Sequence, residues 1–72
     1  MLKKIRDFYQ REYEITKQEV TITQSYSELN RVVWATIQRI FGVANFHMGG
    51  SYDNEIAELY YEYKERLLKL LE

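Results

Sequence analysis

The strongest constraint on the fold of this chain is the helical spacing of the apolar residues near its C-terminal end. In residues 51–72, SYDNEIAELYYEYKERLLKLLE, a turn of about 100° per residue places the apolar side chains on one stripe. The stripe consists of Ile56, Leu59, Tyr60, Tyr63, Leu67, Leu70 and Leu71. Charged side chains fall on the opposite side. The pattern predicts an amphipathic helix over residues 52–71, whose stripe must be buried against other elements.

A second helical pattern lies in the middle of the chain and has a wider apolar arc. Ser25 is followed three residues later by Glu28, the spacing of a capping box at a helix start. The apolar residues after it cover about half of the helix circumference. They are Leu29, Val32, Val33, Trp34, Ile37, Ile40, Phe41 and Ala44. We therefore predict a central helix over residues 25–47 that is packed on two sides.

The first segment begins with helical spacing and continues with residues that fit a strand. Leu2, Ile5, Phe8 and Tyr9 share one side of a helix, whereas EVTIT at residues 19–23 is β-branched and alternates apolar with polar residues. We expect a helix over residues 2–18, followed by an irregular or short extended piece to residue 24. Helical periodicity is not broken there, so a continued helix is the alternative. An extended piece would pair with its copy in a second subunit.

All three glycines and the only histidine lie in GVANFHMGGSYDNE, residues 42–55. The glycine spacing matches neither a dinucleotide-binding fingerprint nor a P-loop. We expect Gly49 or Gly50 to end the central helix in a left-handed conformation, and Ser51 or Asp53 to cap the next one. His47 lacks the partners that a nucleophilic or zinc site requires. The stretch is therefore interpreted as a turn, without catalytic, cofactor-binding or metal-binding residues.

These patterns predict one all-α domain over residues 1–72, a small three-helix bundle with the central helix between the other two. A 72-residue chain forms only a small core, and such domains are marginally stable. Without cysteines, disulfides cannot add stability. The high apolar content, 46% with 15% aromatic residues, favours self-association, for example as a homodimer.

One line on the back of the central helix has a composition typical of an interface. Ala35, Arg39, Gly42 and Phe46 recur at spacings of four, three and four residues. Small residues permit close approach of another backbone, and Arg and Phe are enriched in protein interfaces. The alternatives are that another helix covers this line, or that the helix breaks at Gly42. The predicted partner interface consists of Trp34, Ala35, Arg39, Gly42, Phe46 and Tyr61, with the exposed part of residues 20–22.

A cluster of cations near the N-terminus suggests a different function. Residues 1–11 carry a charge of +3 through Lys3, Lys4, Arg6 and Arg11 with Asp7, whereas residues 51–72 carry −3. The basic helix expected over residues 2–18 could bind nucleic acid, in which case retention of the nucleic acid would weaken steeply with salt. Against this, the helix in the reading position of a helix-turn-helix would be the acidic last one, which repels phosphates.

The expected function is that of a non-catalytic helical module that binds a protein partner, forms a homo-oligomer, or both, as a small regulatory protein. The alternative is a nucleic-acid-binding accessory factor. We expect no enzyme activity, no cofactor and no small-molecule substrate. Charged residues interrupt every apolar run before it could span a membrane, so the expected location is the cytoplasm.

Overall fold

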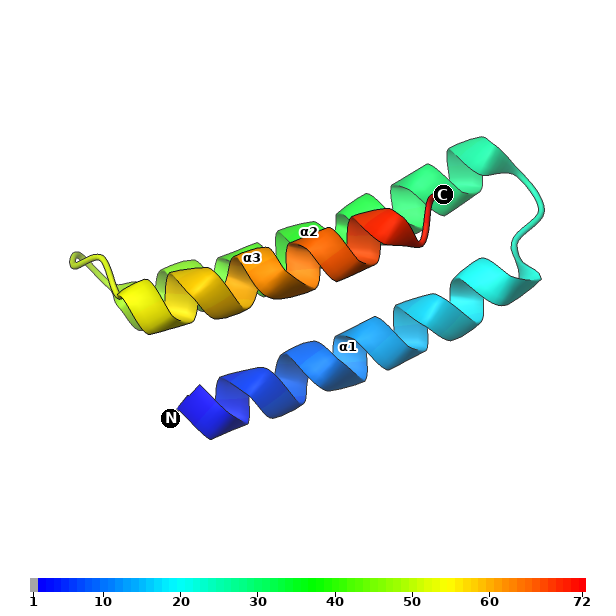
Figure 1. Cartoon of the computed structure of the whole chain (residues 1–72). Coiled ribbons are helices and arrows are strands. Elements are labelled where there is room, and N and C mark those ends of the chain that lie inside the picture. The colour runs from blue at the N-terminus through cyan, green and yellow to red at the C-terminus, as the bar shows by residue number, and fades with distance from the viewer. Residues whose placement is uncertain (1) are drawn as a thin grey trace.

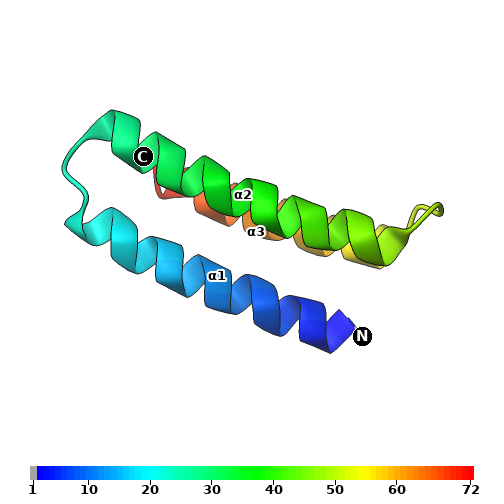
Figure 2. The same cartoon turned by 180° about the vertical axis from the view of Figure 1, so that it is seen from behind.

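The computed structural model describes residues 2–72 and contains three α-helices arranged up, down and up (Figure 1). They are α1 (Leu2–Ile22), α2 (Tyr26–Met48) and α3 (Asn54–Lys69). Every pair of helices is in contact, and the Cα atoms span 40 × 18 × 16 Å. Seen from behind, α2 lies in front of α3, with α1 alongside (Figure 2). No strand occurs within residues 2–72, and the predicted all-α three-helix bundle is confirmed.

The prediction of a helix end near residue 18 and an extended piece to residue 24 is wrong. Helix α1 continues to Ile22, because helical geometry keeps Thr16 in the core and Val20 against it. The polar threonines of the EVTIT stretch also find partners within the helix. The hydroxyl groups of Thr21 and Thr23 donate to the carbonyls of Lys17 and Glu19, at 2.9 and 2.7 Å. Tertiary packing thus overrides the strand preference of these residues.

The start of α2 is as predicted in position but not in its capping. Ser25 precedes the helix, yet its hydroxyl makes no bond to a helix amide. It lies 3.0 Å from the hydroxyl of Ser27, and Glu28 pairs with Arg31 instead of closing a capping box. The predicted capping box is therefore wrong. Glu28 still lies in the first turn of α2, where its negative charge interacts favourably with the helix dipole.

The turn between α2 and α3 follows the expectation for its glycine and its aspartate. Gly49 has a φ of +59°, a conformation that only glycine adopts without strain. Its amide donates to the carbonyl of Asn45 at 3.1 Å. Asp53 accepts from the amides of Glu55 and Ile56, at 3.0 and 3.1 Å, and caps α3. The observed α3 starts two residues later and ends two residues earlier than predicted.

The core lies along the axis of the bundle and contains side chains from all three helices. Its members are Ile5 and Tyr9 of α1, Val33, Ile37, Ile40 and Ala44 of α2, and Ile56, Leu59, Tyr60, Tyr63 and Leu67 of α3. Half of the predicted arc of α2, Val33, Ile37, Ile40 and Ala44, belongs to this core, and Leu29 and Val32 are half-buried. Trp34 and Phe41, on the α3 side of the arc, remain 38% and 46% exposed.

Candidate functional site

The structure divides the predicted interface residues between different sides of α2. Trp34 lies beside α3, where the ammonium group of Lys64 stands 5.8 Å from its ring centroid. Tyr61 of α3 lies on the same side of the molecule, next to Tyr60. Arg39 faces α1 instead. The six residues therefore do not form a single surface.

An aromatic strip runs along the junction of α2 and α3. We define this aromatic strip as Trp34, Phe41, Tyr60 and Tyr61. The rings of Phe41 and Tyr60 have centroids 5.5 Å apart, and those of Tyr60 and Tyr61 are 5.1 Å apart. Tyr61 is 59% exposed, while Tyr60 is buried beneath its neighbours. Exposed, contiguous aromatic surface is characteristic of binding sites.

Lys64 provides the positive charge of the aromatic strip. Its Nζ lies 5.8 Å from the ring centroid of Trp34 and 6.0 Å from that of Tyr60. Contacts of an ammonium with aromatic faces at this distance are attractive. They hold the lysine stem along the rings, where it covers part of the apolar surface and places a cation between Trp34 and Tyr60.

The side of α2 that faces α1 is joined by specific polar contacts. Arg39 donates to Glu12 at 2.7 Å and to the hydroxyl of Thr36 at 3.0 Å. The buried hydroxyls of Thr36 and Thr16 are 2.6 Å apart. Helix α1 therefore contacts Arg39, which is still 53% exposed, and Ala35 in the same line is half-buried. The alternative that another helix covers this line is met only in part.

Gly42 and Phe46 lie on the exposed part of α2. The helix continues through Gly42 to Met48, so the predicted alternative of a break at Gly42 is wrong. A Cβ atom added at Gly42 would meet no other atom within 4 Å. Phe46 is 81% exposed and contacts the ring of His47 edge-on at 5.4 Å. No neighbour within the described chain thus requires a glycine at position 42.

Two core tyrosines have raised pKa values. The hydroxyl of Tyr9 donates to the carbonyl of Ile40 at 3.0 Å in the interior. Burial, and secondarily the nearby Tyr60, raises the pKa of Tyr9 to about 12. Burial followed by the charge of Tyr61 also raises the pKa of Tyr60. Both shifts favour the neutral phenol, so these groups act as structural hydrogen-bonding or packing elements at neutral pH.

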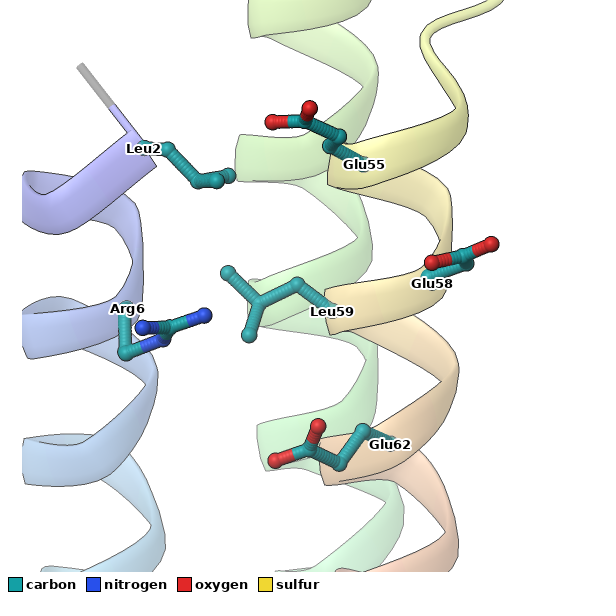
Figure 3. A pocket seen from close by; sticks show the side chains of 6 residues that line it. All are labelled: Leu2, Arg6, Glu55, Glu58, Leu59 and Glu62. Carbon is teal, nitrogen blue, oxygen red and sulfur yellow. The ribbon is translucent and has the colours of Figure 1, made fainter.

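The four predicted nucleic-acid-binding cations lie on the exposed surface of α1. Arg6 lines a shallow groove between α1 and α3, together with Leu2 and Leu59 (Figure 3). Three carboxylates line the same groove, those of Glu55, Glu58 and Glu62. The folding of the chain thus places the acids of α3 beside the basic end of α1 and weakens the positive field that phosphates would meet.

A second shallow hollow lies between α1 and α2. Its lining is formed by Lys4, Ile5, Phe8, Val43 and His47. His47 is exposed here. Within residues 2–72, no three His, Cys, Asp or Glu side chains are grouped so that they could hold a metal ion. Among the same residues, no helix combines the length and the apolar character needed to cross a membrane.

Phe41 and Lys64, which belong to the surface of the aromatic strip, were not assigned to a binding site from the sequence. Phe41 has the helical spacing of a core residue, but it lies at the edge of the arc, where α3 covers only part of its ring. The signal that could have found it is the width of the arc, since two neighbouring helices cannot cover half of a helix completely.

In comparisons with known proteins, no family model, no curated protein and no solved structure matches this chain.

Proposed function

We propose that this chain is a non-catalytic protein-binding module that docks on a protein surface through the aromatic strip. The observation that carries the proposal is the exposure of Trp34, Phe41 and Tyr61, 38%, 46% and 59% respectively, on one side of a small bundle. Aromatic residues are the type most enriched at the centres of protein interfaces. The cytoplasmic location expected from the sequence belongs to the same proposal.

The energetics also favour docking through this surface. Apolar area removed from water contributes about 25 cal/mol per Å², and rings with few rotatable bonds lose little entropy on binding. Trp34 and Phe41 are already held by α2 and by contacts with α3. A partner would therefore meet a surface that is largely preorganised.

Site-specific photo-crosslinking in the native cell tests the proposal. Tyr61 is replaced by photoreactive p-benzoylphenylalanine, and Tyr26, which is 65% exposed at the start of α2, is replaced in a control variant. We expect a covalent protein adduct from position 61 and none of the same mass from position 26. The adduct should disappear when Phe41→Glu is added. Absence of an adduct at position 61, or the same adduct from both positions, would contradict the proposal.

The alternative of a nucleic-acid-binding accessory factor stays a prediction. Lys3, Lys4 and Arg11 are exposed and free to meet phosphates, but Arg6 shares its groove with three glutamates. The aromatic strip, which could stack on bases, involves α2 and α3 and not the basic helix. We therefore base the proposed function on protein binding.

A further inference from the structure

We propose that a second copy of this chain covers the aromatic strip, in a two-fold symmetric dimer in which α3 of each copy packs antiparallel on α2 of the other. The inference rests on the proposed function, because it names the partner for the same surface. The symmetry axis runs parallel to the helices, so α3 of one copy meets the outer face of α2 of the other. We define this outer face as Arg31, Ala35, Gln38 and Gly42, which follow helical spacings of four, three and four residues.

The heights of residues in such a dimer follow from the contacts within one copy. Phe41 lies beside Tyr60, and Trp34 lies beneath Lys64. These two contacts define the antiparallel register of α3 on α2. Here the height of a residue is its position along the direction of the helix axes. Rotation about a two-fold axis parallel to the helices does not change this position. The same register therefore applies between α3 of one copy and α2 of the other.

That register places Tyr61 of one copy between Gln38 and Gly42 of the second copy. Gly42 has open space where a side chain would stand, so the backbone of α2 can accept a tyrosine ring at close approach. Glu65 comes to the height of Ala35, one helical turn from Arg31. The shape of the two surfaces is thus complementary where the largest exposed ring of α3 meets the smallest residue of α2.

Charge complementarity supports this arrangement. The edge of α3 beside Tyr61 carries the carboxylates of Glu58 and Glu65, neither of which has an ion-pair partner within residues 2–72. The outer face of α2 carries Arg31, whose pair with Glu28 is solvent-exposed and weak. The parallel axis places these carboxylates against the helix that carries the arginine, whereas an axis perpendicular to the helices would place α3 on α3 and leave Arg31 unused.

A broad side of the bundle is close in size to one partner's share of a standard interface. It measures 40 by 18 Å between Cα atoms, about 700 Å², whereas each partner of a standard interface contributes roughly 800 Å². The aromatic strip and Lys64 between its rings would lie at the centre of this area. Glu65 and Arg31 would lie nearer to its rim, where charged residues are common in interfaces.

Sedimentation equilibrium of the purified full chain tests the dimer. We expect a monomer–dimer equilibrium for the unchanged chain and an increase in Kd of roughly 100-fold or more for Gly42→Leu, which fills the space that Tyr61 needs. Because nothing lies near that position in the monomer, its helical circular dichroism and melting temperature at low concentration should be unchanged or higher. The matched control Gln18→Leu adds the same side chain to an exposed position of α1 and should leave Kd unchanged.

A charge swap tests the orientation of the two copies. Glu65→Arg and Arg31→Glu should each raise the dimer Kd by about tenfold, and the double variant should return it to near the original value. Lys17→Glu and Glu19→Lys, exposed on α1, are the charge-matched controls. A chain that stays monomeric, a dimer that tolerates Gly42→Leu, or a double swap without recovery would each overturn the inference. A cross-link from position 61 to a different protein would then still support the proposed function.

Discussion

The two sides of α2 differ in how they are joined to their neighbours. Toward α1, buried or partly buried polar groups meet in matched pairs, such as the hydroxyls of Thr16 and Thr36 at 2.6 Å and the Tyr9 hydroxyl on the Ile40 carbonyl at 3.0 Å. Toward α3, no side-chain hydrogen bond joins the helices within residues 2–72, and beside the buried core the contacts include the partly exposed rings of Trp34 and Phe41. Directional contacts define a unique register between the two helices, whereas exposed rings leave apolar surface that a second molecule can bury on binding.

This difference indicates that the stability of the single chain and its association with another molecule depend on different residues. Substitutions on the α1 side should change the free energy of unfolding of the single chain, because they affect buried groups. Substitutions among the exposed rings on the α3 side should change association and leave the unfolding of the monomer nearly unchanged. The first of the following measurements tests this division directly, and the other two test the buried polar groups.

The largest effect is expected from truncating a buried tyrosine and comparing it with an exposed one. Tyr9 is 1% exposed, and its ring lies 5.7 Å from that of Tyr63. Tyr9→Ala should lower the free energy of unfolding by about 3–5 kcal/mol, the typical cost for a buried aromatic ring. Tyr61→Ala should lower it by less than about 0.5 kcal/mol. Urea unfolding followed by circular dichroism, at concentrations where the chain is monomeric, measures both. Similar losses for the two variants would remove the distinction.

The next largest effect is expected at alkaline pH. The pKa of Tyr9 rises from 10.0 to about 12 on folding, so its contribution to stability is complete below pH 10. Between pH 10 and 12 the unfolded chain releases the phenolic proton first, and stability falls by roughly 2–3 kcal/mol. The raised pKa of Tyr60 acts in the same direction.

Urea unfolding at a series of pH values measures this loss. Tyr9→Phe is the control, because it keeps the ring but has no proton to release. Its stability should fall less steeply over the same pH range. Equal slopes for the two proteins would show that the phenol of Tyr9 is not the group responsible.

The smallest of the three effects concerns the threonine pair between α1 and α2. Thr36→Val leaves the Thr16 hydroxyl buried without its partner and should cost about 1–3 kcal/mol. Thr16→Val should cost less, because the Thr36 hydroxyl still donates to the Val32 carbonyl at 3.2 Å and accepts from Arg39. The double variant should be more stable than the sum of the two single losses indicates. Simple additivity in urea unfolding would show that the two hydroxyls are not coupled.

The elements that the sequence predicted correctly are those controlled by local chemistry. The stripe of residues 56–71 defined α3, Asp53 caps it as expected, and Gly49 has the positive φ that ends α2. The EVTIT stretch was misjudged because its β-branched residues favour strands in isolation. These residues are helical because Thr16 and Val20 pack in or against the core, and that packing depends on the tertiary structure.

The candidate site could be predicted only in part. Trp34 and Tyr61 are both members of the predicted partner interface, and the structure places both on the same side of the molecule. Arg39 was assigned to the same interface, but its salt bridge to Glu12 depends on how α1 lies against α2, which helical spacing alone does not specify. Phe41 was assigned to the core because spacing reports the direction of a side chain and not the extent of its coverage.

The sequence by itself determined three amphipathic helices, the turn between the second and the third, and the all-α class, because apolar periodicity and helix-ending residues act within a few positions of each other. The tertiary structure decided which side of α2 faces α1 and which faces α3. It thereby matched Arg39 with Glu12 and Thr36 with Thr16, and left Trp34, Phe41 and Tyr61 partly open to solvent. The physical reason is that two neighbouring helices cover only part of a wide apolar arc, and where the uncovered part lies depends on their packing.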